Sequence, residues 1–192
     1  THHSVREWPY LALSNFSRLT DIKFRRLPLK RLQKLSLREV PRLNIRSLDG
    51  IKDHLQVLKL QGFEWPYFGT TATLLASERP LLLPQLTTLC LRQAKNLREV
   101  VLNTPKLTHL QIQKVPQLTT LKVEAPQLRY LEIEATPKLT KIAPFRSRYL
   151  REVRLKEPLG LTANQQRWFK RLPGLNIELL KDSEEKAVDT LI

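Results

Sequence analysis

Aliphatic residues recur along this chain in one phrase, L-x-x-[LIV]-x-[LIV], which is most regular between residues 84 and 142. Copies open at Leu86, Leu97, Leu107, Leu118 and Leu128, and a degenerate copy opens at Leu139. The steps between them are 11, 10, 11, 10 and 11 residues, so two phrases make a period of 21. A fixed period of about 20 with this leucine pattern is typical of a solenoid of stacked coils.

Each phrase predicts a short strand that follows a corner of the chain. Positions 4 and 6 of the phrase point to the same side, because side chains alternate along a strand. A proline stands two residues before most copies, where its fixed φ and missing N–H suit a corner. One coil cannot bury its own leucines, so it stacks on neighbours about 4.8 Å away, as paired strands do. We therefore predict a β-rich α/β solenoid with a parallel sheet.

The phrases continue on both sides of the regular block and predict one repeat domain over residues 1–180. The step from Leu55 to Leu86 is 31 residues rather than 21, which indicates an insertion. We expect a cap at each end, because an end coil has one uncovered face. The predicted parts are an N-terminal cap at 1–18, repeats at 19–160 with an insertion at 62–84, a C-terminal cap at 161–180 with a helical stripe, and an acidic tail at 181–192.

These phrases resemble leucine-rich repeats over about residues 19–180. The resemblance implies a right-handed superhelix with a curved parallel β-sheet and terminal caps. Two features differ from the best-known consensus: no asparagine follows the strand at the usual place, and the second half-repeat carries a leucine phrase instead of a clear helix. This double-phrase form, punctuated by prolines, is similar to the repeats of F-box-associated leucine-rich-repeat proteins and of some bacterial effectors.

The solenoid interpretation predicts which side chains face outward from the sheet. If the phrases opening at 32, 55, 86, 107, 128 and 150 form one continuous sheet, their outward positions are polar and varied, with an acidic pair flanked by basic residues. Such a face suits an extended or convex protein partner. The alternative is a solvated face without a partner. The candidate partner-binding residues are Lys59, His109, Gln111, Gln113, Tyr130, Glu132, Glu134 and Arg154.

Positive charge is concentrated toward the ends of the chain. The formal net charge is +15, with 13 Lys or Arg against 5 Asp or Glu in residues 1–60 and 9 against 2 in residues 141–172. Residues 61–140 are nearly balanced, at 9 against 6. Such basic ends favour an acidic partner or the phosphates of a nucleic acid, and surface solubility is the alternative. The candidate cations are Lys23, Arg25, Arg26, Lys30, Arg31, Lys34, Arg146, Arg148, Arg151, Arg167, Lys170 and Arg171.

Catalytic motifs are absent from the sequence: it has no G-x-x-x-x-G-K, no H-E-x-x-H and no glycine-flanked serine. Cys90 and His109 fall on adjacent predicted coils, but a nucleophilic pair also needs an oxyanion site and an orienting group, which the pattern does not supply. His54 and His109 lack further ligands at metal-binding spacing. We expect no enzymatic activity, no metal, no cofactor and no small-molecule substrate.

The cysteine count and the hydropathy bear on the compartment. A single cysteine, Cys90, excludes an internal disulfide framework, so we expect an intracellular protein, in the cytoplasm, the nucleus or an organelle. No run approaches the ~18 apolar residues that span a membrane, so no membrane contact is expected.

The function that follows is non-enzymatic binding, as an interaction scaffold or a substrate-recognition domain that uses the sheet face. One alternative is a structural subunit of a ribonucleoprotein whose basic ends contact RNA. Another is a bacterial effector that captures a host protein and works in the host cell.

Overall fold

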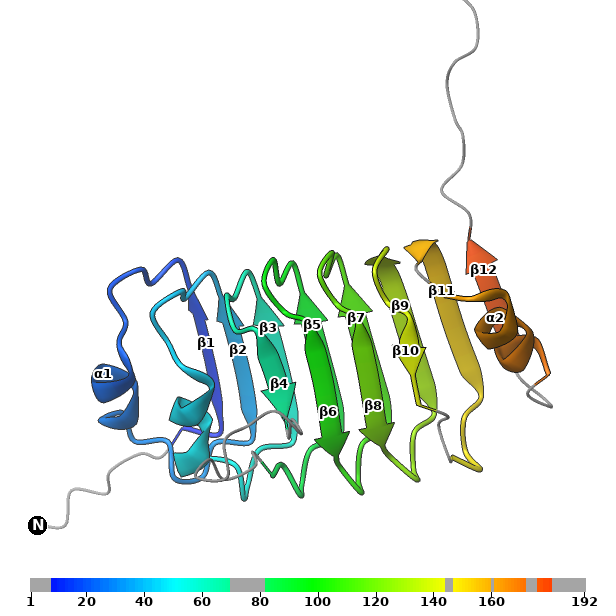
Figure 1. The fold of residues 1–192 in the computed structure, drawn as a ribbon. Coiled ribbons are helices and arrows are strands. Elements are labelled where there is room, and N and C mark those ends of the chain that lie inside the picture. The colour runs from blue at the N-terminus through cyan, green and yellow to red at the C-terminus, as the bar shows by residue number, and fades with distance from the viewer. Residues whose placement is uncertain (1–7, 70–81, 144–146, 160, 172–175, 181–192) are drawn as a thin grey trace, which may run out of the picture.

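A computed structural model describes residues 8–69, 82–143, 147–159, 161–171 and 176–180 of the chain. These residues form a parallel β-solenoid of about 6 turns (Figure 1), which confirms the predicted stack of coils. The strands belong to two sheets, of eight and four strands, and every strand pair is parallel.

The eight-stranded sheet, here called the long sheet, runs the length of the solenoid. Six of its strands carry the phrases opening at 32, 55, 86, 107, 128 and 150, as the sequence predicted. In spatial order the strands are β1 (Tyr10–Ser14), β2 (Lys34–Arg38), β3 (Val57–Gln61), β5 (Thr88–Arg92), β7 (His109–Gln113), β9 (Tyr130–Thr136), β11 (Glu152–Leu159) and β12 (Asn176–Leu180).

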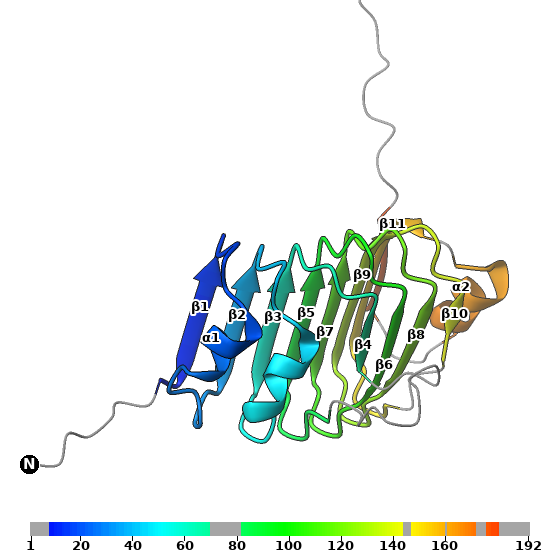
Figure 2. The ribbon, with the colours of Figure 1, turned by 60° about the vertical axis from the view of Figure 1, so that its left-hand side comes forward.

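The four-stranded sheet, here called the short sheet, is built from the alternate phrases opening at 97, 118 and 139, together with β4. Its strands are β4 (Tyr67–Gly69), β6 (Glu99–Asn103), β8 (Thr120–Glu124) and β10 (Lys141–Ile142). Figure 2 shows it as a second layer on one side of the long sheet. The other side of the long sheet is called the outer face below.

The register between strands measures the length of each coil. Thr88 pairs with His109 and His109 pairs with Tyr130, at steps of 21 residues. The step from Val57 to Thr88 is 31 residues, because the insertion lies between β3 and β5. Of the predicted insertion, residues 62–69 lead into and form β4, while residues 70–81 lie outside the described part.

The core between the two layers is a ladder of aliphatic side chains. Leu58, Leu89, Leu110 and Leu131 stand in register on successive strands, and each is 0% exposed. Burying each such side chain stabilises the fold by roughly 1.5–3 kcal/mol. The second layer supplies the opposing apolar surface, so one coil is stable only between its neighbours.

Helical segments take the second-layer position in the coils near the ends. The segment between β1 and β2 contains α1 (Asp21–Arg25), the segment between β2 and β3 contains the 3-10 helix η1 (Ile45–Gly50), and α2 (Ala163–Lys170) precedes β12. In α2, Gln165 donates a hydrogen bond of 2.8 Å to the backbone oxygen of Thr140, next to β10. Helix α2 and strand β12 both lie inside the range predicted as a C-terminal cap.

The N-terminal end differs from the sequence prediction. The repeats were predicted to begin at residue 19, where Leu19, Ile22 and Phe24 fit the leucine phrase, but residues 21–25 are helix α1. Its spacing explains the error, because apolar residues at i and i+3 also share one face of a helix. The first strand is β1, inside the range predicted as a cap, where Leu11 and Leu13 turn toward the core.

Six successive strands of the long sheet each have one residue in the left-handed backbone conformation. This residue directly follows the strand, except in β9, where it lies near the end of the strand. The residues of this left-handed column have φ between 51° and 66°: Asn15, Glu39, Gly62, Gln93, Lys114 and Ala135. Their N–H groups extend the ladder, as when Glu39 donates to the Gln61 oxygen and Lys114 to the Glu134 oxygen, both at 2.9 Å. This conformation costs a non-glycine residue about 1–2 kcal/mol, which the stacking of coils must offset.

Candidate functional site

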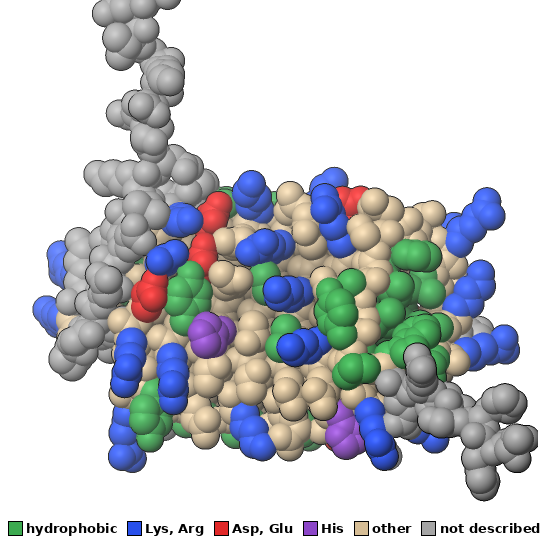
Figure 3. Space-filling model, turned by 180° about the vertical axis from the view of Figure 1, so that it is seen from behind, with side chains coloured by type: hydrophobic (Ala, Val, Ile, Leu, Met, Phe, Trp, Pro, Cys, Tyr) green, Lys and Arg blue, Asp and Glu red, His purple; other side chains and the backbone are tan. Residues whose placement is uncertain are grey.

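The outer face of the long sheet brings together the residues predicted to bind a partner. The parallel register aligns them in columns, for example Lys59, Cys90, Gln111, Glu132 and Arg154 on successive strands. All eight predicted residues lie on this face, seven of them on the adjacent strands β7, β9 and β11. Figure 3 shows the face, with Lys and Arg side chains spread over it and most of the visible acidic side chains toward one end, near a histidine.

Glu132 lies at the centre of a hydrogen-bond network on this face. Alternation points its side chain outward, yet neighbouring side chains leave the residue only 4% exposed. One carboxylate oxygen accepts from the Gln113 amide at 2.6 Å. The other accepts from the Gln111 amide at 3.0 Å and from the Tyr130 hydroxyl at 2.5 Å. The Lys156 ammonium lies 3.7 Å from the first oxygen.

This network shifts the pKa values of both Glu132 and Tyr130. Burial by itself raises the pKa of Glu132, but the hydrogen bonds from Tyr130, Gln113 and Gln111 and the charge of Lys156 outweigh it, so the pKa lies below its ordinary value. Burial and the bond to the ionised Glu132 raise the pKa of Tyr130 to about 12. Glu132 is therefore an anion with donors on both oxygens, which makes it a poor general base and a rigid anchor for its neighbours.

Aromatic and charged side chains surround this anchor. The rings of His109 and Tyr130 stack with centroids 5.9 Å apart, and the guanidinium carbon of Arg154 lies 5.8 Å from the Tyr130 centroid. Arg154 also pairs with Glu152 at 2.8 Å. These contacts hold the rings and the charged groups in one arrangement, so a partner meets a preorganised surface.

The predicted surface cations form two groups, which lie at opposite ends of the solenoid (Figure 1). At the N-terminal end, Lys23 and Arg25 are exposed on α1, where Arg25 donates to the backbone oxygen of Arg46 at 3.1 Å. The others of this group are exposed after α1 or at the start of β2: Arg26, Lys30, Arg31 and Lys34. Lys34 alone among them belongs to the outer face.

The C-terminal group is less compact. Arg148 and Arg151 are exposed just before β11, and Arg167 and Arg171 are exposed on or after α2. Arg146 lies outside the described residues, as does the side chain of Lys170. The structure therefore does not bring the twelve predicted cations into one patch.

Cys90 lies on the outer face but is only 4% exposed. Burial raises the pKa of its thiol, against the opposing charges of Arg92 and Lys59. His109 pairs in register with Thr88 rather than with Cys90, so the two side chains are diagonal neighbours. A protonated, covered thiol is a weak nucleophile. Within the described ranges, no three His, Cys, Asp or Glu residues gather closely enough to hold a metal ion.

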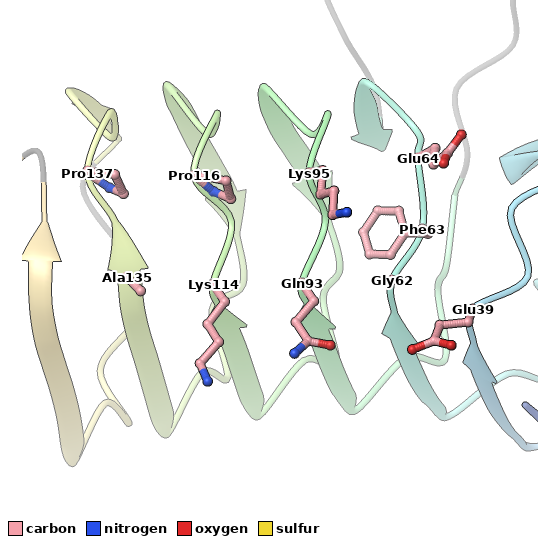
Figure 4. A pocket seen from close by; sticks show the side chains of 10 residues that line it. All are labelled: Glu39, Gly62, Phe63, Glu64, Gln93, Lys95, Lys114, Pro116, Ala135 and Pro137. Carbon is pink, nitrogen blue, oxygen red and sulfur yellow. The ribbon is translucent and has the colours of Figure 1, made fainter. Parts of the chain in front are cut away.

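A groove that the sequence pattern did not predict runs along one edge of the solenoid. Its volume is about 650 Å³, and it crosses the coils between the left-handed column and the residues that follow it. Figure 4 shows Glu39 and Glu64 toward the β2 end, Lys114 and Pro116 further along, and Ala135 and Pro137 toward the β9 end. Five of its ten lining residues belong to the left-handed column, and the alternation of side chains along the strands carries no signal for this conformation.

The length and hydropathy of the helices and the similarity to known proteins both bear on the function of this surface. None of the helices in the described part of the chain is long and apolar enough to cross a membrane. The site consists of a fixed carboxylate, stacked rings and exposed cations on an open sheet. Comparison with protein-family models finds no match to the chain, and comparisons with curated proteins and with solved structures find none either.

Proposed function

We propose that the chain is a leucine-rich-repeat solenoid. The leucine phrases at the strands of the long sheet support this assignment. So do α1 and η1, because the first two coils carry short helical segments in the second layer, on the side opposite the outer face. The short sheet is then a variation in which the alternate leucine phrases of the middle coils form strands instead of helices.

We further propose that the protein is a non-enzymatic binding module that holds a protein partner on the outer face. The observation that carries this proposal is the Glu132 network, in which three side chains are fixed on one buried carboxylate. Cross-strand hydrogen bonds of this kind stabilise the sheet, and they also hold its outward side chains in one arrangement. Fixed side chains lose little conformational entropy when a partner binds, which favours recognition.

The dimensions of the outer face fit this function. Eight strands about 4.8 Å apart and five residues long give a surface of roughly 34 Å by 17 Å. The area of this face is about 580 Å², which is a large part of the roughly 800 Å² that a standard protein interface buries on each partner. Glu132 is ionised and accepts hydrogen bonds on both carboxylate oxygens, which argues for binding rather than proton transfer.

The test compares partner capture by matched variants. The face variant combines His109→Ala with Arg154→Glu, and the control combines Thr120→Ala with Lys122→Glu on the short sheet. Both change the charge by the same amount. Proteins retained from an extract of the producing cells are quantified by mass spectrometry. We expect proteins that the wild type and the control retain equally to be lost from the face variant. Retention of the same proteins by all three would refute the proposed surface.

A further inference from the structure

The outer face has a second region, on β1, β2, β3 and β5, that differs in charge from the Glu132 network. Its outward positions carry four exposed cations: Lys34, Arg38, Lys59 and Arg92. No outward position on these four strands is acidic. Glu39, which follows β2, approaches Arg38 only to 3.9 Å, and both side chains are more than half exposed. This region, here called the basic half-face, therefore keeps its positive charge.

The register spaces these cations as a track. Lys59 stands one strand away from Lys34 and Arg38 and two residues along from each of them, and Arg92 stands in the same relation to Lys59. Such diagonal steps separate Cα atoms by about 8 Å, from a strand spacing of 4.8 Å and a rise of about 3.3 Å per residue. Long, flexible Lys and Arg side chains on this spacing can meet successive charges of a linear polyanion.

Exposed aromatic rings adjoin the track at its β1 end. Tyr10 pairs in register with Lys34, points to the outer face, and is 58% exposed. Trp8 and Phe16, which flank β1, are 39% and 51% exposed. Rings with free faces beside cations are the combination on which proteins bind single-stranded nucleic acids, since bases stack while phosphates pair.

We propose that the basic half-face binds single-stranded nucleic acid, with phosphates on the four cations and a base stacked on Tyr10. An acidic protein segment would use the cations equally well, but it lacks the regularly spaced planar bases that stack on exposed rings. Double-stranded nucleic acid offers its phosphates but keeps its bases stacked inside. This site lies on the same outer face as the proposed protein-binding surface and shares Lys59 with it, but it does not include the Glu132 network, so either can fail without the other.

The test measures binding of fluorescein-labelled 12-mers of oligouridylate and oligothymidylate by fluorescence anisotropy from 50 to 200 mM salt. If four phosphates are neutralised, the logarithm of the affinity falls against the logarithm of salt with a slope of about −2.8, or about 50-fold over this range. Lys59→Gln with Arg92→Gln lowers the expected slope to about −1.4, or about 7-fold. The control, Lys122→Gln with Lys141→Gln on the short sheet, keeps the wild-type slope.

The stacking step is tested separately. Tyr10→Ala weakens binding by about 5-fold or more while leaving the salt slope unchanged, because it removes a stacking surface and no charge. Equal melting temperatures of all variants establish that they fold alike. The proposal is overturned by undetectable binding at 50 mM salt, by equal losses in the half-face and control variants, or by polyglutamate or duplex binding as tight as that of the single strands.

Discussion

Replacing Glu132 by alanine removes the carboxylate on which three side chains of the outer face converge. Its two oxygens accept hydrogen bonds from Gln111, Gln113 and Tyr130, and the residue is 4% exposed. The backbone of β9 pairs on both sides and does not depend on this side chain. The substitution therefore reports on the network rather than on the coil.

The expected loss in the free energy of unfolding follows from the three hydrogen bonds to Glu132. A hydrogen bond to a charged group contributes about 1.5–3 kcal/mol net. The low end applies here, because the three donors are only half-buried and can turn to water once the carboxylate is gone. Removing the carboxylate also removes the cost of burying it. We expect Glu132→Ala to lower the free energy of unfolding by about 2–4 kcal/mol.

Glu134→Ala is the matched control, since Glu134 lies two residues along the same strand and faces the same side. Its ion pair with Lys156 is 3.9 Å long and partly exposed, so its loss costs less than about 1 kcal/mol. Urea unfolding at pH 7, followed by circular dichroism, measures both variants. Equal losses would refute the interpretation of Glu132 as a fixed anchor.

The pH dependence adds a second check on the same variant. The pKa of Glu132 is lowered in the folded chain, so its contribution is complete above the unfolded value of about 4.3. It disappears as the pH falls through the lower folded value, where the carboxylate takes up a proton in both states. The stability difference between wild type and Glu132→Ala should therefore shrink in acid. A difference that grows below pH 4 would contradict the direction of the shift.

Two further predictions concern the coil and the buried thiol. Gly69 has a φ of +99°, and a Cβ there would lie 1.9 Å from the Val101 oxygen, so Gly69→Ala should cost at least about 3 kcal/mol or prevent folding. In the control Gly50→Ala, the added Cβ meets nothing within 4 Å, so the free energy of unfolding should change by less than about 1 kcal/mol. Similar urea midpoints for Gly69→Ala and Gly50→Ala would contradict this account. Cys90 should react with iodoacetamide at pH 8 at least about tenfold more slowly in the folded chain than in urea, and equal rates would show that the thiol is not covered.

Much of the fold was predictable because the solenoid repeats one simple rule. Alternation in the phrases at 86, 107 and 128 defines the inward leucines, and the period of 21 then fixes which residues become neighbours across strands. The outward column through Gln111 and Glu132 was predicted in this way, and the register agrees. Such arguments need only local geometry, repeated many times.

The parts that were not predicted depend on tertiary context. The phrase ending at Phe24 fits either a strand or a helix, and its residues 21–25 form helix α1. Alternation gave the direction of Glu132 but not its burial, since Gln111 and Gln113 on β7 and Lys156 on β11 approach it from the neighbouring strands. The left-handed column was missed because Gln93 and Lys114 carry no strong preference for positive φ.

The outer face of the long sheet is the surface at which we propose that a protein partner binds. The most direct test places a photo-crosslinking amino acid at position 109, exposed on that face, and in a second variant at position 122, exposed on the short sheet. Both variants are irradiated in the producing cells, and the adducts are identified by mass spectrometry. Protein adducts formed at position 109 and not at 122 are the predicted result. Adducts at 122 alone, or the same adducts at both positions, would contradict the claim.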